Sequence, residues 1–374
     1  MANKTVGILT FHASHNCGSM LQTYAMQKFL NKHDYQPEII NFASPGQIAL
    51  YRVFTPNRSL KQIVRNLILL MNRSRLLKCV KAYETFISNY FMLSGDLATS
   101  AQELRDASYH AVIAGSDQIW NTTIADYDDA YFLSWVKSAK RIAYAPSFGA
   151  RNPLKYAQNP REISRWLEEF DALSVREKNG QRWIADMIGK EVPFVLDPTL
   201  LLEAQDYDQI AAVDLQLPKK YIFYYAPGYS LKINRLVQKI SRKYKMPVIA
   251  FNTKSFVLRG MHLTGMQLPE YENPSAYLQL MKNASLVITT SFHGTIFSTI
   301  FKKKFWVIKN GGMYGDDDRV ASLTDALQIG SRVITEEYNE SFDYMQEVDY
   351  SLYMKNLVSY QKISQEYLLS ALEG

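Results

Sequence analysis

The sequence predicts an α/β protein built from two Rossmann-like domains in tandem, with a cleft between them. Two observations carry this prediction. The chain has 374 residues, which is more than a single ordinary core organises. Short apolar runs that end in polar or turn residues alternate with helical segments along most of it, which is typical of open parallel sheets. A hydrophobic content of 47% with 21% charged residues indicates a folded globular chain.

The first domain is predicted over residues 1–205. Residues 5–11 have the β-branched and aromatic content of a strand, residues 20–33 place apolar side chains at helical spacing, and residues 37–42 return to strand. These segments form a parallel pair with a right-handed crossover. A helical excursion over 51–95 follows. Beyond it we expect strands in 110–120, 141–149, 171–177 and 193–201, and helices over 160–170 and 179–188.

The second domain is predicted over residues 206–345, after a helix and linker at 200–218. Residues 346–374 are expected to form a C-terminal helix that packs back on the first domain. Ligands in such sheets bind beyond the carboxyl ends of the strands, so the shared cleft is the predicted binding place. Within the second domain we expect strands in 220–227, 246–251, 285–290 and 304–308, and helices over 231–244, over 274–283 and after residue 293.

The composition favours a cytoplasmic protein. The N-terminal residues show no secretory signal, and the longest apolar stretch, 63–71, is interrupted by Arg65 and Asn66 and is too short for a bilayer span. Cys17 and Cys79 are too few for a disulfide framework.

Positive charge is concentrated in one segment, Tyr51 to Tyr83. It holds eight Lys and Arg residues and no Asp or Glu, so the remainder of this +6 chain carries a net −2. One interpretation is a solvated helical hairpin. The other is a surface for anionic lipid headgroups or for a phosphorylated, lipid-linked substrate, at the inner face of the membrane. Nucleic acid is not an expected partner, because no nucleic-acid motif accompanies the segment.

The sequence TTSFHGTIFS, residues 289–298, is the first candidate site. Ser291 and His293 fall in the turn between a predicted strand and a predicted helix, which faces the cleft. Unpaired N–H groups at the helix start, around Gly294 and Thr295, favour an anion such as phosphate or carboxylate beside the imidazole. The alternative is that His293 caps the helix or bonds a neighbouring carbonyl.

Two further candidates follow strands of the first domain. Arg176 offers a planar fork for phosphate or carboxylate, or else an ion pair with Glu177. The loop 12–20 lacks the dinucleotide and P-loop glycine patterns. Its polar residues suit either a sugar or phosphate contact or a plain helix cap. They are His12, Asn16, Gly18 and Ser19.

The sequence GSDQIWN, residues 115–121, suggests carbohydrate chemistry. Asp117 is placed to accept a proton from a sugar hydroxyl, Trp120 offers a platform for a pyranose ring, and Asn121 follows. The alternative is an Asx turn with a buried tryptophan. Asp197 is interpreted as strand termination before the linker.

A glycine-rich loop at 310–323 completes the candidates. Lys309 and Arg319 are cations that can reach a cleft anion. Asp316 to Asp318 suit either Mg²⁺ or a helix N-terminus, and capping is favoured because no other carboxylate cluster completes a metal shell. No metal is therefore expected. The serine-hydrolase elbow and the zinc H-E-x-x-H pattern are absent from the sequence.

Several motifs in order carry a family resemblance: NCGSMLQTYAMQKFL, GSDQIWN, SVREKNG, VLDPTLL and SFHGTIFS. Together they resemble the polysaccharide pyruvyl transferase family of bacteria, from about Val6 to about Gly330. The resemblance implies a GT-B-like architecture and transfer of pyruvate from phosphoenolpyruvate onto sugar hydroxyls, forming a ketal on cell-surface glycans or their precursors. Phosphoenolpyruvate is then the donor substrate and no cofactor is implied.

The resemblance also implies roles for residues. Arg176 matches the family's donor-binding arginine, and His293 matches the histidine of an Arg-Leu-His motif that reads Ser291-Phe292-His293 here. Either Lys309 or Arg319 supplies the missing charge, or the chain belongs to a branch of the family whose donor differs. We assign the role of acid to His293 and the role of base to Asp117. The residues expected to bind the donor are Arg176, Ser291, His293, Gly294, Thr295, Lys309 and Arg319. The residues expected to bind a sugar or lipid-linked glycan acceptor are His12, Asn16, Gly18, Ser19, Trp120 and Asn121.

Two other functions remain open. A glycosyltransferase of similar architecture would use a nucleotide sugar. A non-catalytic glycan-binding protein would bind glycan without turnover.

Overall fold

The first half of the chain folds around a parallel sheet. The computed structural model describes residues 4–106, 108–309 and 318–374, and its first sheet has the order β2-β1-β3-β4. Every pair is parallel, with Ile8 opposite both Ile39 and Ile113. The register therefore places the carboxyl ends of these strands at one edge. The strands are β1 (Thr5–Leu9), β2 (Gln36–Ile39), β3 (Ala111–Ala114) and β4 (Lys140–Ala143).

Two predicted strands of this domain, 171–177 and 193–201, form only single bridges, Ile142 to Ala172 and Val175 to Phe194. The prediction of full strands in these two segments is therefore wrong. The side chain of Ser174 bonds the backbone of Ala143 and Ala145 where a longer ladder would continue. The helices around the sheet are α1 (Cys17–Lys32), α5 (Pro153–Tyr156), α6 (Pro160–Glu168) and α7 (Lys178–Ile188), with turns of 3-10 helix at η1 (Ala101–Glu103), η2 (Asp129–Phe132) and η3 (Pro198–Leu201).

A second parallel sheet follows, in the order β6-β5-β7-β8-β9. All side chains of its first four strands in sequence are buried, as expected where helices cover both faces. The strands are β5 (Ile222–Tyr225), β6 (Val248–Phe251), β7 (Leu286–Thr289), β8 (Phe305–Ile308) and β9 (Val333–Ile334). The helical elements are α8 (Ala204–Asp208), α9 (Leu231–Tyr244), α10 (Thr253–Leu258), η4 (Met261–Thr264), α11 (Pro274–Asn283), α12 (Phe292–Ile300), α13 (Arg319–Ala326) and η5 (Gly330–Arg332).

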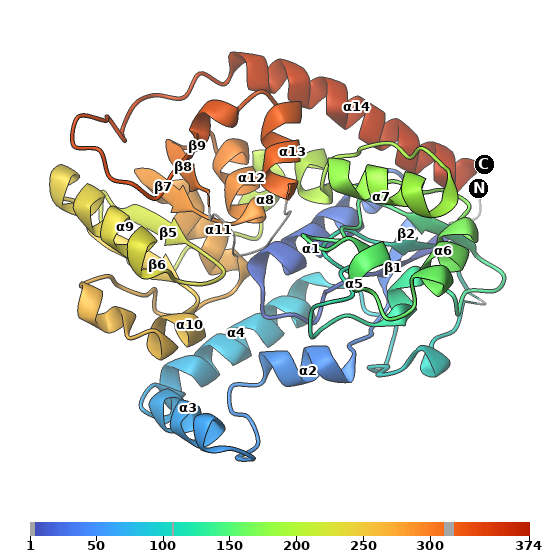
Figure 1. Cartoon of the computed structure of the whole chain (residues 1–374), viewed down its shortest axis with the longest axis horizontal. Coiled ribbons are helices and arrows are strands. Elements are labelled where there is room, and N and C mark those ends of the chain that lie inside the picture. The colour runs from blue at the N-terminus through green and yellow to red at the C-terminus, as the bar shows by residue number, and fades with distance from the viewer. Residues whose placement is uncertain (1–3, 107, 310–317) are drawn as a thin grey trace.

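The two sheets lie side by side and share packing (Figure 1). One hydrophobic cluster includes Ile8 of the first sheet and both Phe223 and Tyr277 around the second. The two α/β units predicted in tandem are therefore present and joined by a continuous core. The exact domain limits stay a prediction.

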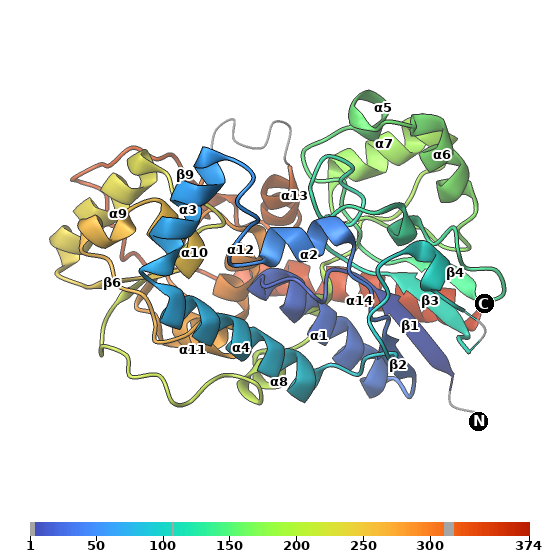
Figure 2. The ribbon, with the colours of Figure 1, turned by 90° about the horizontal axis from the view of Figure 1, so that it is seen from below.

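The segment predicted to be helical, residues 51–95, is largely helical, and it contacts the second unit. It comprises α2 (Pro45–Tyr51), α3 (Leu60–Leu70) and α4 (Arg73–Tyr90). Leu69 and Leu76 pack with Val257 of α10. Figure 2 shows α3 beside α10 of the second unit and α4 extending from there toward α1 of the first unit.

The last helix, α14 (Ser351–Glu373), runs along both units (Figure 1). Near its start, Tyr353 donates to Thr299 of α12 at 2.8 Å. Near its end, Tyr367 donates to the carbonyl of Ala143 at 2.9 Å. The expected contact with the first unit is therefore accompanied by one with the second. Among the described residues, no helix is both long and apolar enough to span a bilayer.

Candidate active site

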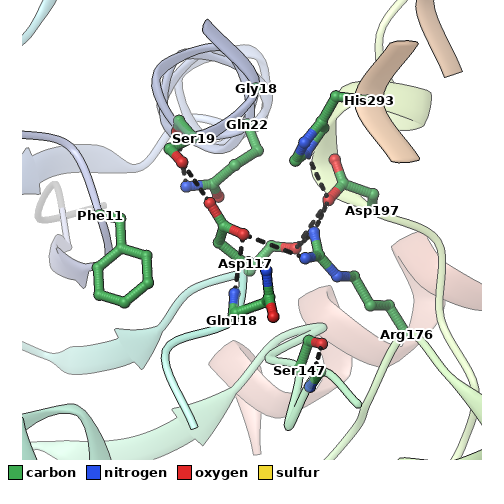
Figure 3. Close-up of polar contacts among 12 residues, drawn as sticks. Phe11, Gly18, Ser19, Gln22, Asp117, Gln118, Ser147, Arg176, Asp197 and His293 are labelled. Carbon is green, nitrogen blue, oxygen red and sulfur yellow. Dashed lines mark hydrogen bonds and ion pairs between the residues drawn. The ribbon is translucent and has the colours of Figure 1, made fainter. Parts of the chain in front are cut away.

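Residues that follow the strands of both sheets meet where the two units touch. Asp117 follows β3, Arg176 and Asp197 follow the two single-bridge segments, and His293 follows β7 in the second unit. Ser19 reaches the same place from the first turn of α1. Figure 3 shows these five side chains pointing toward one another. The carboxyl ends of parallel strands thus gather polar groups from distant parts of the sequence.

The five side chains form one connected network (Figure 3). Ser19 Oγ donates to Asp117 Oδ2 at 2.5 Å. Arg176 donates from Nη2 to Asp117 Oδ1 at 3.2 Å and from Nη1 to Asp197 Oδ2 at 2.6 Å. His293 Nε2 lies 3.4 Å from the same Asp197 oxygen, close enough for an ion pair but not aligned for a well-formed hydrogen bond. The arginine therefore bridges two carboxylates, and the second carboxylate faces the histidine.

Burial makes this network electrostatically strong. Arg176 and Asp197 are each 1% exposed. Burial alone would raise the pKa of Asp197, but His293, Arg176 and Thr199 together hold it well below its usual range. Burial likewise opposes ionisation of Asp117, and Arg176 and His293 lower its pKa below the ordinary value. Both carboxylates are therefore charged at neutral pH.

The backbone at Asp117 is unusual. Its φ is +83°, in the left-handed region that few non-glycine residues occupy. The strained turn is held by Ser147, whose N–H donates to the Asp117 carbonyl at 2.8 Å, and by the Gln118 N–H, which donates to Asp117 Oδ1 at 2.8 Å. Strain of this kind collects at functional sites, where it aims one side chain.

His293 is held against α1 of the other unit. A Cβ atom at Gly18 would lie 2.3 Å from His293 Nδ1, so only glycine permits this approach. Ser291 caps α12, accepting from the Gly294 N–H at 3.3 Å, and Thr295 Oγ1 donates to the Ser291 carbonyl at 3.0 Å. The cap of α12 is therefore Ser291 and not His293, and the donor contacts expected of Ser291, Gly294 and Thr295 stay predictions.

Glu177 is a second buried acid beside the network. Burial raises the pKa of its carboxyl to about 7, against the opposing effect of Arg176. Oε1 accepts from the Phe148 N–H at 2.8 Å, whereas Oε2 is buried without a hydrogen-bond partner among the described residues. The predicted Arg176–Glu177 ion pair is replaced by pairs with Asp117 and Asp197.

Two cavities lie near the network, and residues of the network line only the smaller one. The smaller, of about 310 Å³, is lined by Ser19, Asp117 and Asp126. The larger, of about 330 Å³, is lined by Cys17 of α1 and Tyr225 of β5. Asn16, Leu50 and Tyr51 line both cavities. The two spaces are therefore neighbours that share one wall.

The smaller cavity is acidic. Burial raises the pKa of Asp126 to about 6, and the nearby Asp117 adds to this effect. A carboxyl group with a pKa near 6 is mostly ionised at neutral pH yet binds a proton more readily than an ordinary aspartate, which suits a base that takes a proton from a ligand.

The larger cavity is aromatic, with one cation, Lys254, and one buried carboxyl group, Glu272, whose oxygens accept hydrogen bonds from Asn252 and Thr253. His15 stacks on Tyr83 with 4.9 Å between ring centroids. Burial and Lys254 lower the pKa of His15 to about 4, so the imidazole is neutral at pH 7. Burial lowers the pKa of Lys254 to about 8, and its Nζ donates to the carbonyls of Leu50 and Arg52. An aromatic face beside a half-buried cation fits a ligand with both a ring or methylene part and an anionic part.

Three residues predicted to contact the acceptor line neither cavity. Trp120 is fully buried, stacks on Phe132 and donates to the Tyr131 carbonyl at 3.1 Å, so it belongs to the core. His12 is 1% exposed and lines neither cavity. The side chain of Asn121 is taken up by a local turn with Gln118 and Thr123. In each case an apolar or turn environment satisfies the side chain without a ligand.

The remaining predicted residues have mixed positions. Asn16 caps α1, accepting from the Gly18 N–H at 2.9 Å, and also lines both cavities. Lys309 is exposed at the end of β8, and Arg319 begins α13. Asp318 Oδ2 accepts from the Asn179 N–H at 2.9 Å and so caps α7 of the other unit. Asp316 and Asp317 lie outside the described residues.

The sequence reasoning missed Asp197, Asp126 and Lys254. Asp197 had a signal, since it follows a strand and precedes a proline, but that pattern also describes strand termination. Asp126 and Lys254 have no motif and are identified only by their cavities. In the described ranges, no group of three or more His, Cys, Asp or Glu side chains is disposed to hold a metal ion.

Comparison with known structures agrees with this architecture. S. aureus MnaA in a co-structure with UDP has a TM-score of 0.52 at 12% identity, over 97% of this chain and 88% of that one. UDP-GlcNAc 2-epimerase from Neisseria meningitidis bound to UDP-GlcNAc has a TM-score of 0.49 at 13% identity, over 98% and 100%. At 12% identity the likeness to MnaA is one of fold alone, and it confirms the predicted GT-B-like fold.

Comparison of sequences gives the family. No curated protein sequence matches the chain. The model of the polysaccharide pyruvyl transferase family matches residues 16–312, which include all five residues of the network. That match spans well over half of the chain. The chain therefore belongs to the polysaccharide pyruvyl transferase family.

Proposed function

We propose that this protein transfers a pyruvyl group from phosphoenolpyruvate to two hydroxyls of a sugar, in a cell-surface polysaccharide or its precursor, forming a ketal. Family membership supports the transfer of a pyruvyl group to polysaccharide. The observation that carries the proposal is the buried network of both units beside two adjoining cavities, one acidic and one aromatic with a lysine.

The reaction needs one acid, one base and positively charged groups that bind the phosphate and carboxylate of the donor. Protonation of the methylene carbon of phosphoenolpyruvate gives an oxocarbenium-like centre at C2, which one sugar hydroxyl attacks. The second hydroxyl then displaces phosphate and closes the ketal. One hydroxyl proton balances the proton taken up by the new methyl group, and the other leaves with phosphate. No redox step is involved.

The smaller cavity suits the acceptor. Its carboxylates would repel a trianionic donor, whereas they accept hydrogen bonds from sugar hydroxyls. Asp117 is locked by Arg176 and Ser19 and its pKa is lowered, so it makes a weak base. Asp126, with its pKa raised to about 6, is better matched to the hydroxyl proton. We assign deprotonation to Asp126 and orientation of the hydroxyls to Asp117.

The larger cavity suits the donor. Ser291 stands where the family motif has arginine, so positive charge must come from elsewhere. Lys254 lines this cavity, and the cavity adjoins α12 through Tyr225, which lies against Gly294. In this account Lys254 neutralises the carboxylate or phosphate, His293 supplies the proton, and Arg176 positions Asp117 and Asp197. Contacts of Lys309 and Arg319 with the donor remain an alternative source of charge.

Turnover tests the proposal directly. The purified protein is incubated with phosphoenolpyruvate and a panel of oligosaccharides, phosphate release is followed, and the ketal methyl group is sought by NMR. Phosphate release that requires both substrates, with a new methyl signal, is the expected result. Turnover of a nucleotide sugar with no use of phosphoenolpyruvate would instead make the protein a glycosyltransferase.

Asp126→Asn tests the assignment of the base. We expect kcat/KM of the wild type to fall below about pH 6, because protonated Asp126 cannot accept a proton. The variant should lose on the order of 10²-fold and show no such fall. Asp96→Asn, at an exposed carboxylate, is the control. A variant that keeps the wild-type pH profile would remove Asp126 from the mechanism.

A further inference from the structure

Helix α3 carries an apolar surface that the rest of the described chain leaves uncovered. Leu60, Leu67 and Met71 are 76%, 59% and 88% exposed. At 3.6 residues per turn, the exposed apolar side chains cover roughly 160° of the helix circumference. We call this set the α3 stripe; it consists of Leu60, Ile63, Val64, Leu67, Ile68, Leu70 and Met71.

The opposite side of α3 is anchored. Leu69 is fully buried and packs with Leu76 and Val257. Arg65 donates to Thr55 and Asn66, which ties the preceding loop to the helix. Figures 1 and 2 place α3 at the outer edge of the molecule, beside α10. The stripe is therefore presented outward by a fixed helix and is not a loosely attached segment.

The segment that contains the stripe is rich in positive charge. The segment from Tyr51 to Tyr83 has no acidic residue, and among the described residues Glu270 is the acidic side chain that forms an ion pair with it, at Lys78. Five other exposed cations remain: Arg52, Arg58, Lys61, Arg73 and Lys81. An exposed apolar helix face within a cationic segment is typical of helices that lie in the plane of an anionic membrane surface.

We propose that α3 docks this protein on an anionic lipid bilayer, with the α3 stripe entering the headgroup and acyl boundary and the cations of the same segment contacting lipid phosphates. The charges argue against the other simple occupant, a second copy of the chain. A symmetric dimer through this face would bring two basic clusters together. Anionic lipid instead supplies both the apolar phase and the opposite charge.

Docking of this kind would bring the larger cavity close to the bilayer. Leu76, Cys79 and Tyr83 of α4 line that cavity, and α4 follows α3 directly. A glycan held on a membrane lipid would then reach the adjoining smaller cavity, which is assigned to the acceptor, without leaving the surface. This consequence rests on the proposed function, whereas the docking itself does not.

A polarity-sensitive dye on the stripe tests the proposal. Cys17 and Cys79 are both buried, so a cysteine introduced at Leu67 can be labelled selectively in the full-length protein. Leu263→Cys, at a leucine that is 83% exposed on the second unit, is the matched control. Each labelled protein is mixed with vesicles of phosphatidylglycerol and phosphatidylcholine, or of phosphatidylcholine alone. We expect a blue shift for the dye at position 67 with the anionic vesicles, and none at position 263.

Co-sedimentation with the same vesicles separates the two contributions. Leu60→Gln with Leu67→Gln and Met71→Gln removes apolar area, and Lys61→Gln with Arg73→Gln and Lys81→Gln removes charge. Each triple variant should bind at least about tenfold more weakly. Raising the ionic strength from about 0.1 M to about 1 M, which shortens the Debye length from about 10 Å to about 3 Å, should weaken wild-type binding.

The proposal is overturned by wild-type protein that binds neither vesicle, or both equally, or by triple variants that bind like the wild type. Concentration-dependent self-association that the apolar variant abolishes, without vesicle binding, would assign the stripe to a second copy instead. Because neither assay uses phosphoenolpyruvate, failure here leaves pyruvyl transfer standing, and failure of transfer leaves docking standing.

Discussion

The candidate site depends on a few residues whose side chains are matched across the two units. Arg176 carries one positive charge between two carboxylates, Asp117 and Asp197, and His293 approaches the second of them from the other unit. Breaking such a buried set by removing one partner leaves an uncompensated charge. The network therefore couples the chemistry of the site to the way the two units fit together.

Gly18→Ala tests the contact between α1 and His293. The added methyl group would lie 2.3 Å from His293 Nδ1, so the imidazole must move. We expect a loss of about 1–3 kcal/mol in unfolding free energy, measured by chemical denaturation, together with a fall in turnover. Gly330→Ala, where the new methyl group meets nothing within 4 Å, should have little effect on either. Equal behaviour of the two variants would mean that the approach of Gly18 to His293 is not tight in solution.

Glu177→Gln tests the raised pKa of this buried acid through the pH dependence of stability. Burial raises the pKa of Glu177 from 4.5 to about 7, so the native protein binds this proton more tightly than the unfolded chain does. Its contribution to stability is full below about pH 4.5 and is lost as the pH rises through about 7. The glutamine variant keeps a neutral side chain and the acceptor for the Phe148 N–H.

The free energy of unfolding is measured by chemical denaturation from pH 5 to pH 8. As the pH rises, that of Glu177→Gln should increase relative to that of the wild type, by up to about 3 kcal/mol. Glu191→Gln, at an exposed carboxylate, should show no such trend. A difference between Glu177→Gln and the wild type that stays constant across this range would contradict the raised pKa.

Residue types at strand ends could be predicted to matter, but their partners could not. Asp117, Arg176 and His293 were all identified as candidates, and they do meet. A tryptophan after a strand is equally suited to a sugar face or to a core, and in the structure Trp120 is buried and stacks on Phe132. Asp197 was passed over because its ion pair with Arg176 depends on packing that the sequence does not display.

At the scale of elements, the alternation of strands and helices was predicted well because fully buried parallel strands are continuous apolar runs. The errors lie at 171–177 and 193–201, where single bridges replace predicted strands. The hairpin of α3 and α4 was expected, but its packing on α10 was not, since Leu69 resembles its exposed neighbours in sequence.

Helix α14 offers a prediction at this scale. Leu368 is fully buried where the helix packs on the first unit, whereas Leu352 of the same helix is 51% exposed. Leu368→Ala should lower the unfolding free energy by about 2–5 kcal/mol through the cavity it creates. Leu352→Ala should cost far less, about 0.5 kcal/mol or below. Similar losses in thermal or chemical denaturation would show that α14 does not pack as described.

At the scale of the whole molecule, two α/β units form one body with a shared core, and α4 and α14 contact both. The tandem arrangement could be predicted from the repeated α/β pattern. How the units face each other could not, because the contacts that set it join residues about 100 to 270 positions apart, such as Asp197 with His293 and Gly18 with His293.

The central claim is that the protein binds phosphoenolpyruvate at the junction of the two units, beside His293. The most direct measurement is thermal unfolding with phosphoenolpyruvate, inorganic phosphate or a nucleotide sugar, for the wild type, His293→Gln and the exposed control His262→Gln. A ligand at a hundredfold excess over its Kd stabilises the native state by about 2.7 kcal/mol. We predict a rise in Tm with phosphoenolpyruvate for the wild type and His262→Gln, and a smaller rise or none for His293→Gln. A rise with the nucleotide sugar alone, or an unchanged response in His293→Gln, would contradict the account.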